Sequence, residues 1–208
     1  MEDFVEVPAS KKSLAKRKCV FGVGINDANY ITEHRINGKQ LRCPFYRTWV
    51  GVLERCYANF AHTKYPTYQG CTICDEWKLF SNFKDWMQEQ DWKNKELDKD
   101  LLIIGNKIYS PNTCMFVTST INKLIGVHGF SKNTYAIGVS WSKSNNKYRA
   151  DCDVQGKQRY LGLYLTEEEA SQVYRACKKE VIICVAKQQS DLKLKSALLS
   201  IANNLSSH

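Results

Sequence analysis

The chain lacks any long apolar run, and this absence limits what it can be. No stretch of its 208 residues approaches the roughly 20 consecutive apolar residues of a membrane-spanning helix. The N-terminal segment MEDFVEVPAS is acidic and has no apolar core of the kind found in signal peptides. We therefore expect no membrane association and a cytoplasmic protein, or a nuclear one if its host has a nucleus.

Cysteine is abundant, but paired cysteine motifs are scarce. Nine cysteines in an unsecreted chain favour reduced thiols over a disulfide framework. The single C-x-x-C motif, Cys71 to Cys74, is half of a zinc pattern, and no second C-x-x-C occurs. Cys71 and Cys74 are therefore candidate ligands of a structural Zn²⁺, with small core residues as the alternative.

The composition indicates a folded protein with a polyanionic partner. Hydrophobic residues make up 43% and aromatic residues 12% of the chain, as in globular proteins. The formal net charge of +9 favours nucleic acid as the partner. We expect an α+β fold in four parts: a basic N-terminal arm (1–40), a first compact domain (41–127), a second domain (134–186) and a tail helix (187–208).

Apolar periodicity predicts the main elements of the first domain. Apolar residues at helical spacing predict helices over residues 45–57 and 73–87 and a short helix over 118–125. Two strand-like runs, 97–104 and 108–117, flank Gly105-Asn106, which is typical of a hairpin turn. The domain is therefore expected to contain a strand, turn, strand, helix unit.

The segment 137–174 predicts three short strands followed by a helix. In the middle strand, Tyr148, Ala150, Cys152 and Val154 alternate with charged residues, so one face is expected to be core and the other wet and partly cationic. The helix is expected to begin after Thr166, with Glu169 completing a capping box.

This segment resembles the Apetala-two/ethylene-response-factor DNA-binding domain. The matching residues are Gly138-Val139, Tyr148-x-Ala150, Tyr160-Leu161-Gly162-x-Tyr164 and Thr166-Glu167-x-Glu169-Ala170. The resemblance covers about a quarter of the chain and implies that the sheet lies in the major groove of double-stranded DNA. It implies these DNA-facing residues: Trp141, Lys143, Lys147, Arg149, Arg159 and Tyr160. A sheet-plus-helix module without a ligand is the alternative.

A second resemblance covers most of residues 20–190. Four segments occur in order: YRTWVGVLERCY (46–57), YQGCTICDEWKLFSNFKDW (68–86), LDKD (97–100) and YSPNTCMFVTSTIN (109–122). Together they resemble phage-encoded His-Asn-His (HNH) endonucleases of the homing type. That resemblance implies a metal-dependent hydrolase that nicks or cuts double-stranded DNA with Mg²⁺ or Mn²⁺.

The resemblance also implies where the catalytic groups would lie. Its metal ligand falls on Asp98, its general base on Lys99 beside Asp100, its orienting residue on Thr113 beside Asn112, and its helical ligand on Asn122. The oxygen ligands of the cation would be Asp98, Asp100 and Asn122. The motif contains no histidine, and His62, outside it, is a candidate substitute base.

Three functions remain open at this point. The intact order of motifs favours an HNH-family endonuclease. The missing histidine favours a catalytically degenerate relative that acts as a DNA-binding regulator or interference factor. The third hypothesis is an adaptor that binds protein through its sheet and through the aromatic-rich loop of residues 61–70.

Overall fold

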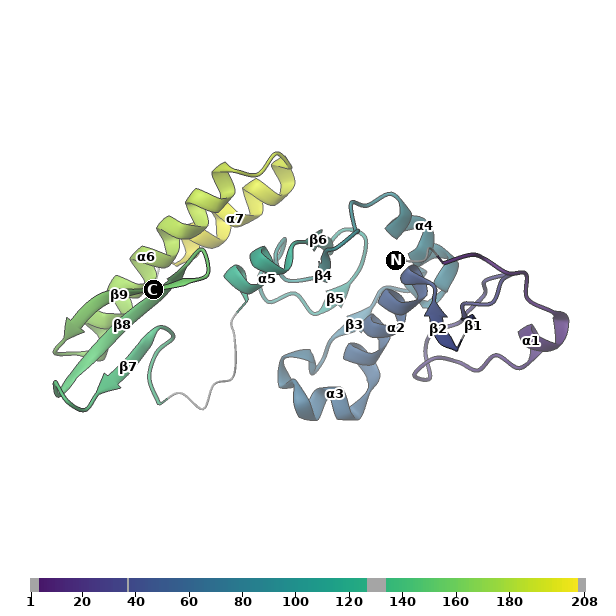
Figure 1. Cartoon of the computed structure of the whole chain (residues 1–208), viewed down its shortest axis with the longest axis horizontal. Coiled ribbons are helices and arrows are strands. Elements are labelled where there is room, and N and C mark those ends of the chain that lie inside the picture. The colour runs from purple at the N-terminus through teal and green to yellow at the C-terminus, as the bar shows by residue number, and fades with distance from the viewer. Residues whose placement is uncertain (1–3, 37, 127–133, 206–208) are drawn as a thin grey trace. The chain divides into compact units, whose positions relative to one another are not determined.

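A computed structural model describes residues 4–36, 38–126 and 134–205 of the chain. The chain folds into two compact units of α+β architecture, Met1–Ser119 and Thr120–His208 (Figure 1). Within the described ranges, no helix combines the length and the apolar character needed to cross a bilayer.

The first unit is built from short helices and two-stranded sheets. In chain order its elements are α1 (Lys11–Ala15), β1 (Glu33–Ile36), β2 (Lys39–Arg42), α2 (Pro44–Tyr57), α3 (Asn59–Lys64), the 3-10 turn η1 (Pro66–Tyr68), β3 (Thr72–Ile73), the 3-10 turn η2 (Glu76–Lys78), α4 (Phe80–Gln88), β4 (Glu96–Asp98), β5 (Ile108–Tyr109) and β6 (Met115–Val117). Helix α5 (Ser119–Ile125) starts at the boundary between the units.

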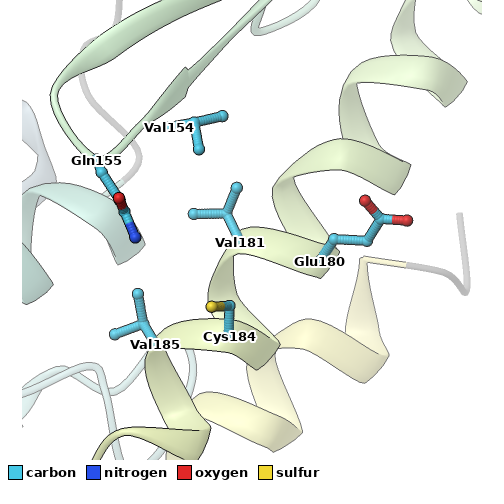
Figure 2. A pocket seen from close by; sticks show the side chains of 6 residues that line it. All are labelled: Val154, Gln155, Glu180, Val181, Cys184 and Val185. Carbon is cyan, nitrogen blue, oxygen red and sulfur yellow. The ribbon is translucent and has the colours of Figure 1, made fainter.

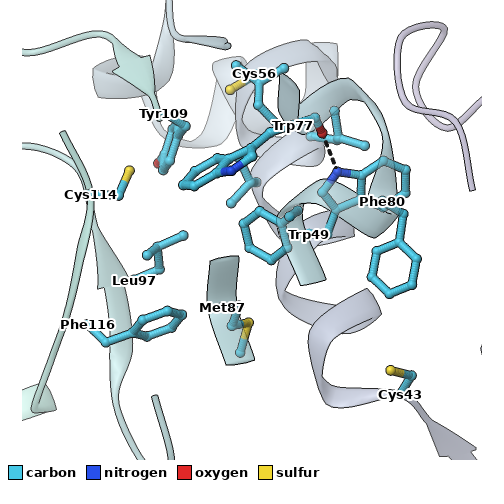
Figure 3. Packing of buried hydrophobic residues seen from close by; sticks show 14 of the residues in the cluster. Cys43, Trp49, Cys56, Trp77, Phe80, Met87, Leu97, Tyr109, Cys114 and Phe116 are labelled. Carbon is cyan, nitrogen blue, oxygen red and sulfur yellow. Dashed lines mark hydrogen bonds between the residues drawn. The ribbon is translucent and has the colours of Figure 1, made fainter. Parts of the chain in front are cut away.

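Helices α2 and α4 enclose the core of this unit. Trp49 and Trp77 are fully buried, and the indole Nε1 of Trp49 donates a hydrogen bond of 2.7 Å to the carbonyl of Trp77 (Figure 3). Phe80 packs edge-on to Tyr46 with ring centroids 5.2 Å apart. Helix α2 confirms the helix that apolar spacing predicts over residues 45–57.

The described part of the predicted N-terminal arm, residues 4–36 and 38–40, packs against this core and does not form a separate arm. The Arg17 guanidinium donates to the carbonyls of Asn26 at 2.9 Å and Tyr30 at 2.6 Å, and also to that of Ala28. These bonds hold the segment against the unit, and Ala28 and Tyr30 are buried in its core. The lysines near Arg17 therefore extend from a folded surface.

Two local predictions were wrong, both because of non-local pairing. The predicted helix over 73–87 starts only at Phe80, since Ile73 pairs in parallel with Tyr109 of β5. The predicted hairpin around Gly105-Asn106 does not form either. Strand β4 instead pairs antiparallel with β6, placing Asp98 opposite Met115, and residues 99–114 connect them.

The second unit is a three-stranded antiparallel sheet with two helices. Its elements are β7 (Val139–Ser142), β8 (Lys147–Val154), β9 (Lys157–Tyr164), α6 (Glu167–Lys187) and α7 (Leu192–Asn204), with β8 central in the sheet. The predicted three strands and helix are confirmed. Helix α6 packs on β8 and also on α7 (Figure 1).

Local chemistry fixes the start of α6 and its approach to the sheet. The predicted capping box forms: the Glu169 amide donates to Thr166 Oγ1 at 3.2 Å, and the Glu169 carboxylate accepts from the Thr166 amide at 3.1 Å. Gly138 has a φ of +78°, and a Cβ there would lie 2.1 Å from the Tyr174 ring. Glycine thus allows β7 to begin directly against the helix.

Candidate nucleic-acid interface

The register of the sheet defines which side chains share a face. Ala150 and Cys152 of β8 are buried on the side of α6. The alternate residues of β8 therefore point away from the helix, and their cross-strand partners point with them. We call this side the outer face; it consists of Ser140, Ser142, Lys147, Arg149, Asp151, Asp153, Gln158, Tyr160 and Leu163.

The structure divides the predicted DNA-facing residues between the two sides of the sheet. Lys147, Arg149 and Tyr160 lie on the outer face, as predicted. Trp141 stands opposite Tyr148, and Arg159 stands opposite Cys152, so both belong to the side covered by α6. They therefore do not share a face with the other predicted DNA-facing residues.

The cause is the strand register, which the sequence alone does not reveal. Trp141 packs edge-on against Tyr148 with ring centroids 4.8 Å apart, so it extends the core of the unit. A bulge in β9 at Leu161 shifts the pairing between Ala150 and Asp151. As a result Tyr160 lies opposite Asp151 on the outer face.

Arg149 is the centre of this face. Its Nε and Nη2 donate to the two carboxylate oxygens of Asp151 at 2.7 and 2.8 Å, and its guanidinium lies 5.2 Å from the centroid of the Tyr160 ring. The hydrogen bond to Asp151 raises the pKa of Arg149 above its usual value. The Asp151 side chain is 11% exposed and that of Arg149 48%, so a nearly buried carboxylate holds an exposed cation.

This pairing leaves half of the guanidinium free to bind a ligand. Asp151 occupies the edge formed by Nε and Nη2. The other edge, formed by Nη1 and Nη2, still carries two parallel N–H donors. That pair of donors matches the O6 and N7 acceptors of guanine in the major groove, or two oxygens of a phosphate.

Basic residues lie at both ends of the central strand. Lys143 belongs to the β7–β8 turn and Lys147 follows it, while Lys157 and Arg159 follow the β8–β9 turn. The eight residues of β8 span roughly 23 Å at about 3.3 Å per residue. By register Lys157 and Arg159 belong to the side of α6, so the outer face has a charge-balanced centre with cations at its β7–β8 end, an arrangement that suits contact with a phosphate backbone.

A sequence signal for this surface is the distribution of acidic residues. The fifty residues from Leu101 to Ala150 contain no aspartate or glutamate. The first carboxylate after them is Asp151, which is already paired, and Asp153 accepts the Gly156 amide at 2.8 Å. Ser140, Ser142, Gln158 and Leu163 were missed because only the register places them on the outer face.

The strand, strand, helix order of the predicted nuclease site is present as β4, β6 and α5. Asp98 ends β4, and Lys99 and Asp100 follow it in a tight turn. Asn122 lies on α5, beyond the boundary that separates the two units. Of the predicted catalytic residues, the first unit thus brings Asp98, Lys99 and Asp100 together, while Asn122 belongs to the second unit.

Contacts within the turn occupy these side chains. Asp98 Oδ1 accepts the amides of Asp100 at 2.8 Å and Leu101 at 2.7 Å, and burial raises the pKa of Asp98. Lys99 is only 5% exposed; its ammonium forms an ion pair with Asp100 and donates to the carbonyl of Asn106 at 2.8 Å. Lys99 thus holds the 99–106 loop closed.

The remaining predicted catalytic residues also have structural contacts. Thr113 Oγ1 donates to the carbonyl of Ile108 at 2.6 Å and accepts the Ser110 amide at 3.1 Å, which shapes the turn before β6. Asn112 is exposed in that turn. His62 Nε2 lies 3.0 Å from the carbonyl oxygen of Arg55 on the neighbouring helix.

The donor set does not fit a divalent cation as it stands. Asp98 uses one oxygen for two backbone amides, and Asp100 faces an ammonium that would repel a metal ion. Across the ranges that the structure covers, no three His, Cys, Asp or Glu side chains gather closely enough to hold a metal ion.

The cysteines are reduced and largely buried. All nine fall within the described residues and are free thiols. Burial raises the pKa of Cys74 to about 11 and those of Cys56 and Cys114 to about 12, so these thiols are protonated in the metal-free chain. Cys71 donates weakly to the carbonyl of Thr67 at 3.9 Å.

One hollow of about 170 Å³ lies between the end of β8 and helix α6 (Figure 2). Its lining is mostly apolar, with Val154, Val181, Cys184 and Val185. It includes none of the predicted site residues and no convergent set of polar groups of the kind that orients a small ligand.

No protein-family model, curated protein or solved structure matches this chain. The function of the chain is therefore inferred from the positions and contacts of its own residues.

Proposed function

We propose that this protein binds double-stranded DNA through the outer face of the β7–β9 sheet and recognises sequence with Arg149. The observation that carries the proposal is the Arg149 guanidinium, held on one edge by Asp151 and lying beside Tyr160. A major groove about 12 Å wide admits strands of this kind, and an oriented arginine can donate two hydrogen bonds to one guanine.

The charge distribution supports the same function. Thirteen lysines and arginines face seven aspartates and glutamates in the second unit, and the acid-free stretch 101–150 extends into it. Lys147, at the start of β8 on the outer face, and Lys143 in the turn before it would contact phosphates, which fixes orientation without reading sequence. Arg149 and Tyr160 would face the bases.

A shift assay with the full chain and duplex DNA tests this proposal. Wild type should bind at low salt, with affinity falling steeply as salt rises because bound phosphates release counterions. Arg149→Ala should weaken binding and reduce base preference, whereas Lys187→Ala, at the end of α6, should do neither. Binding that is absent at low salt, or identical in wild type and Arg149→Ala, would refute the proposal.

A second candidate function is metal-dependent cleavage of DNA, favoured by the β4, β6, α5 order and by the partly buried carboxylate of Asp98. The contacts of Asp98, Lys99 and Asp100 favour the binding function over this one. Incubating supercoiled DNA with the protein and Mg²⁺ or Mn²⁺ separates the two. Cleavage by wild type that Asp98→Asn abolishes would establish the nuclease; no cleavage with either metal would leave the DNA-binding function alone.

A further inference from the structure

A surface of the first unit combines exposed apolar rings with basic groups and contains no acidic residue. Residues 55–74 include no aspartate or glutamate, and the loop 101–108 also has none. The two segments lie side by side, because Lys107 Nζ donates to the carbonyl of Thr67 at 2.8 Å and β3 pairs with β5. We call the surface formed by residues 60–68 and 103–108 the aromatic–basic surface.

Its apolar side chains are unusually exposed for their size. Phe60 is 61% and Tyr65 50% exposed, and Ile103 and Ile104 are exposed to a similar degree. Exposed apolar side chains grouped on one surface often mark an interaction site.

The rings are fixed by their neighbours. The Tyr65 and Tyr68 rings meet edge-on with centroids 6.0 Å apart, and Lys64 Nζ lies 5.2 Å from the centroid of Tyr65. Arg55 lies 5.9 Å from the centroid of Tyr68 on the inner side. Tyr65 is thus an oriented ring next to a cation, and no carboxylate of its own segment repels an anion.

This combination fits an unpaired nucleotide. Proteins that bind single strands without sequence preference join a basic surface along the backbone to aromatic rings on which bases stack. From the exposed ring of Tyr65, the adjacent cations and the absence of acids, we propose that the aromatic–basic surface binds single-stranded DNA. A base stacks on Tyr65, and Lys64 contacts the phosphates.

The proposal is separate from duplex binding by the outer face, since the two surfaces share no residue. Fluorescence anisotropy of the full chain with a labelled oligothymidine of about 20 nucleotides, longer than the largest usual site of about 16, measures it. Wild type should bind at low salt. Tyr65→Ala should weaken binding about fivefold or more, the loss expected for one stacked base, while Tyr65→Phe should retain it because the ring remains.

Two further variants keep the test decisive. Lys64→Ala should reduce the slope of log affinity against log salt by about 0.7, the value for one phosphate contact on a single strand. Lys187→Ala, at the exposed end of α6 and outside both surfaces, should leave oligothymidine binding unchanged. No binding by wild type at low salt, equal affinities of wild type and Tyr65→Ala, or equal losses in Tyr65→Ala and Lys187→Ala would each overturn the proposal, whatever the duplex assay gives.

Discussion

Replacing Asp151 with alanine should make the protein less selective for DNA sequence without lowering its affinity for arbitrary duplexes. The carboxylate holds Arg149 through two hydrogen bonds of 2.7 and 2.8 Å, so it fixes the edge of the guanidinium that remains free. Without it, the arginine must lose its rotamer freedom on binding, a cost that reduces affinity for the preferred site about two- to tenfold.

The same change also removes a negative charge from the surface that we propose meets phosphates. Affinity for arbitrary duplexes should therefore rise at low salt, since a repulsive term is lost. The two effects have opposite signs, and their combination lowers the ratio of specific to non-specific affinity. Losing the guanine contact altogether, as in Arg149→Ala, should reduce the same ratio about five- to 150-fold.

The assay begins with selection of a preferred duplex from a random library by the wild-type chain. Affinities are then measured for that duplex and for one in which its guanines are exchanged. Asp151→Asn is the matched control, because it removes the charge but keeps one acceptor for Arg149. It should raise non-specific affinity as Asp151→Ala does while retaining more selectivity. An unchanged affinity ratio in Asp151→Ala would refute the role assigned to the ion pair.

Three further predictions concern the folded state. Burial raises the pKa of Asp98, so the folded chain favours its protonated form, and the free energy of unfolding should fall as the pH rises from about 4 through that raised pKa. Urea unfolding at both ends of this pH range should show the fall in wild type but not in Asp98→Asn. An equal pH dependence in the two proteins would contradict the prediction. Gly138→Ala should lower the free energy of unfolding by about 2–5 kcal/mol, because the alanine would have a positive φ and its Cβ would collide with the Tyr174 ring. Gly156→Ala, with a φ of +80° but open space around it, should cost only about 1–2 kcal/mol. Equal melting temperatures of the two variants would rule out a destabilising contact with Tyr174. Thr166→Ala should cost about 0.5–2 kcal/mol through loss of the helix cap, measured by thermal unfolding against Thr166→Ser, which should keep most of that stability.

The elements that the sequence predicts well are those whose stability is local. Helix α2 follows from apolar spacing, and the start of α6 follows from the Thr166–Glu169 capping box. The alternation along β8 correctly separates Ala150 from Arg149, because it depends only on the pleat of one strand. These features need no knowledge of a distant partner.

The features that the sequence does not predict depend on pairing between distant segments. Ile73 becomes a strand only because β5 lies next to it, and the faces of Trp141 and Arg159 follow from the register. The structural role of Lys99 in the predicted active site was missed for a related reason. A lysine next to two aspartates suggests a surface ion cluster, but Lys99 is buried and bonds to the carbonyl of Asn106, seven residues later in the chain.

The pairing of α7 with α6 sets the smallest fragment that can be expected to fold. Leu194 and Leu198 of α7 are buried, as are Ile182 and Ala186 on α6, the helix that it packs against. A DNA-binding fragment that stops at residue 186 would expose this apolar seam to solvent, and the bared surface would favour aggregation. Fragments for binding studies or crystallisation should therefore continue to residue 205, even though α7 contributes nothing to the outer face of the sheet.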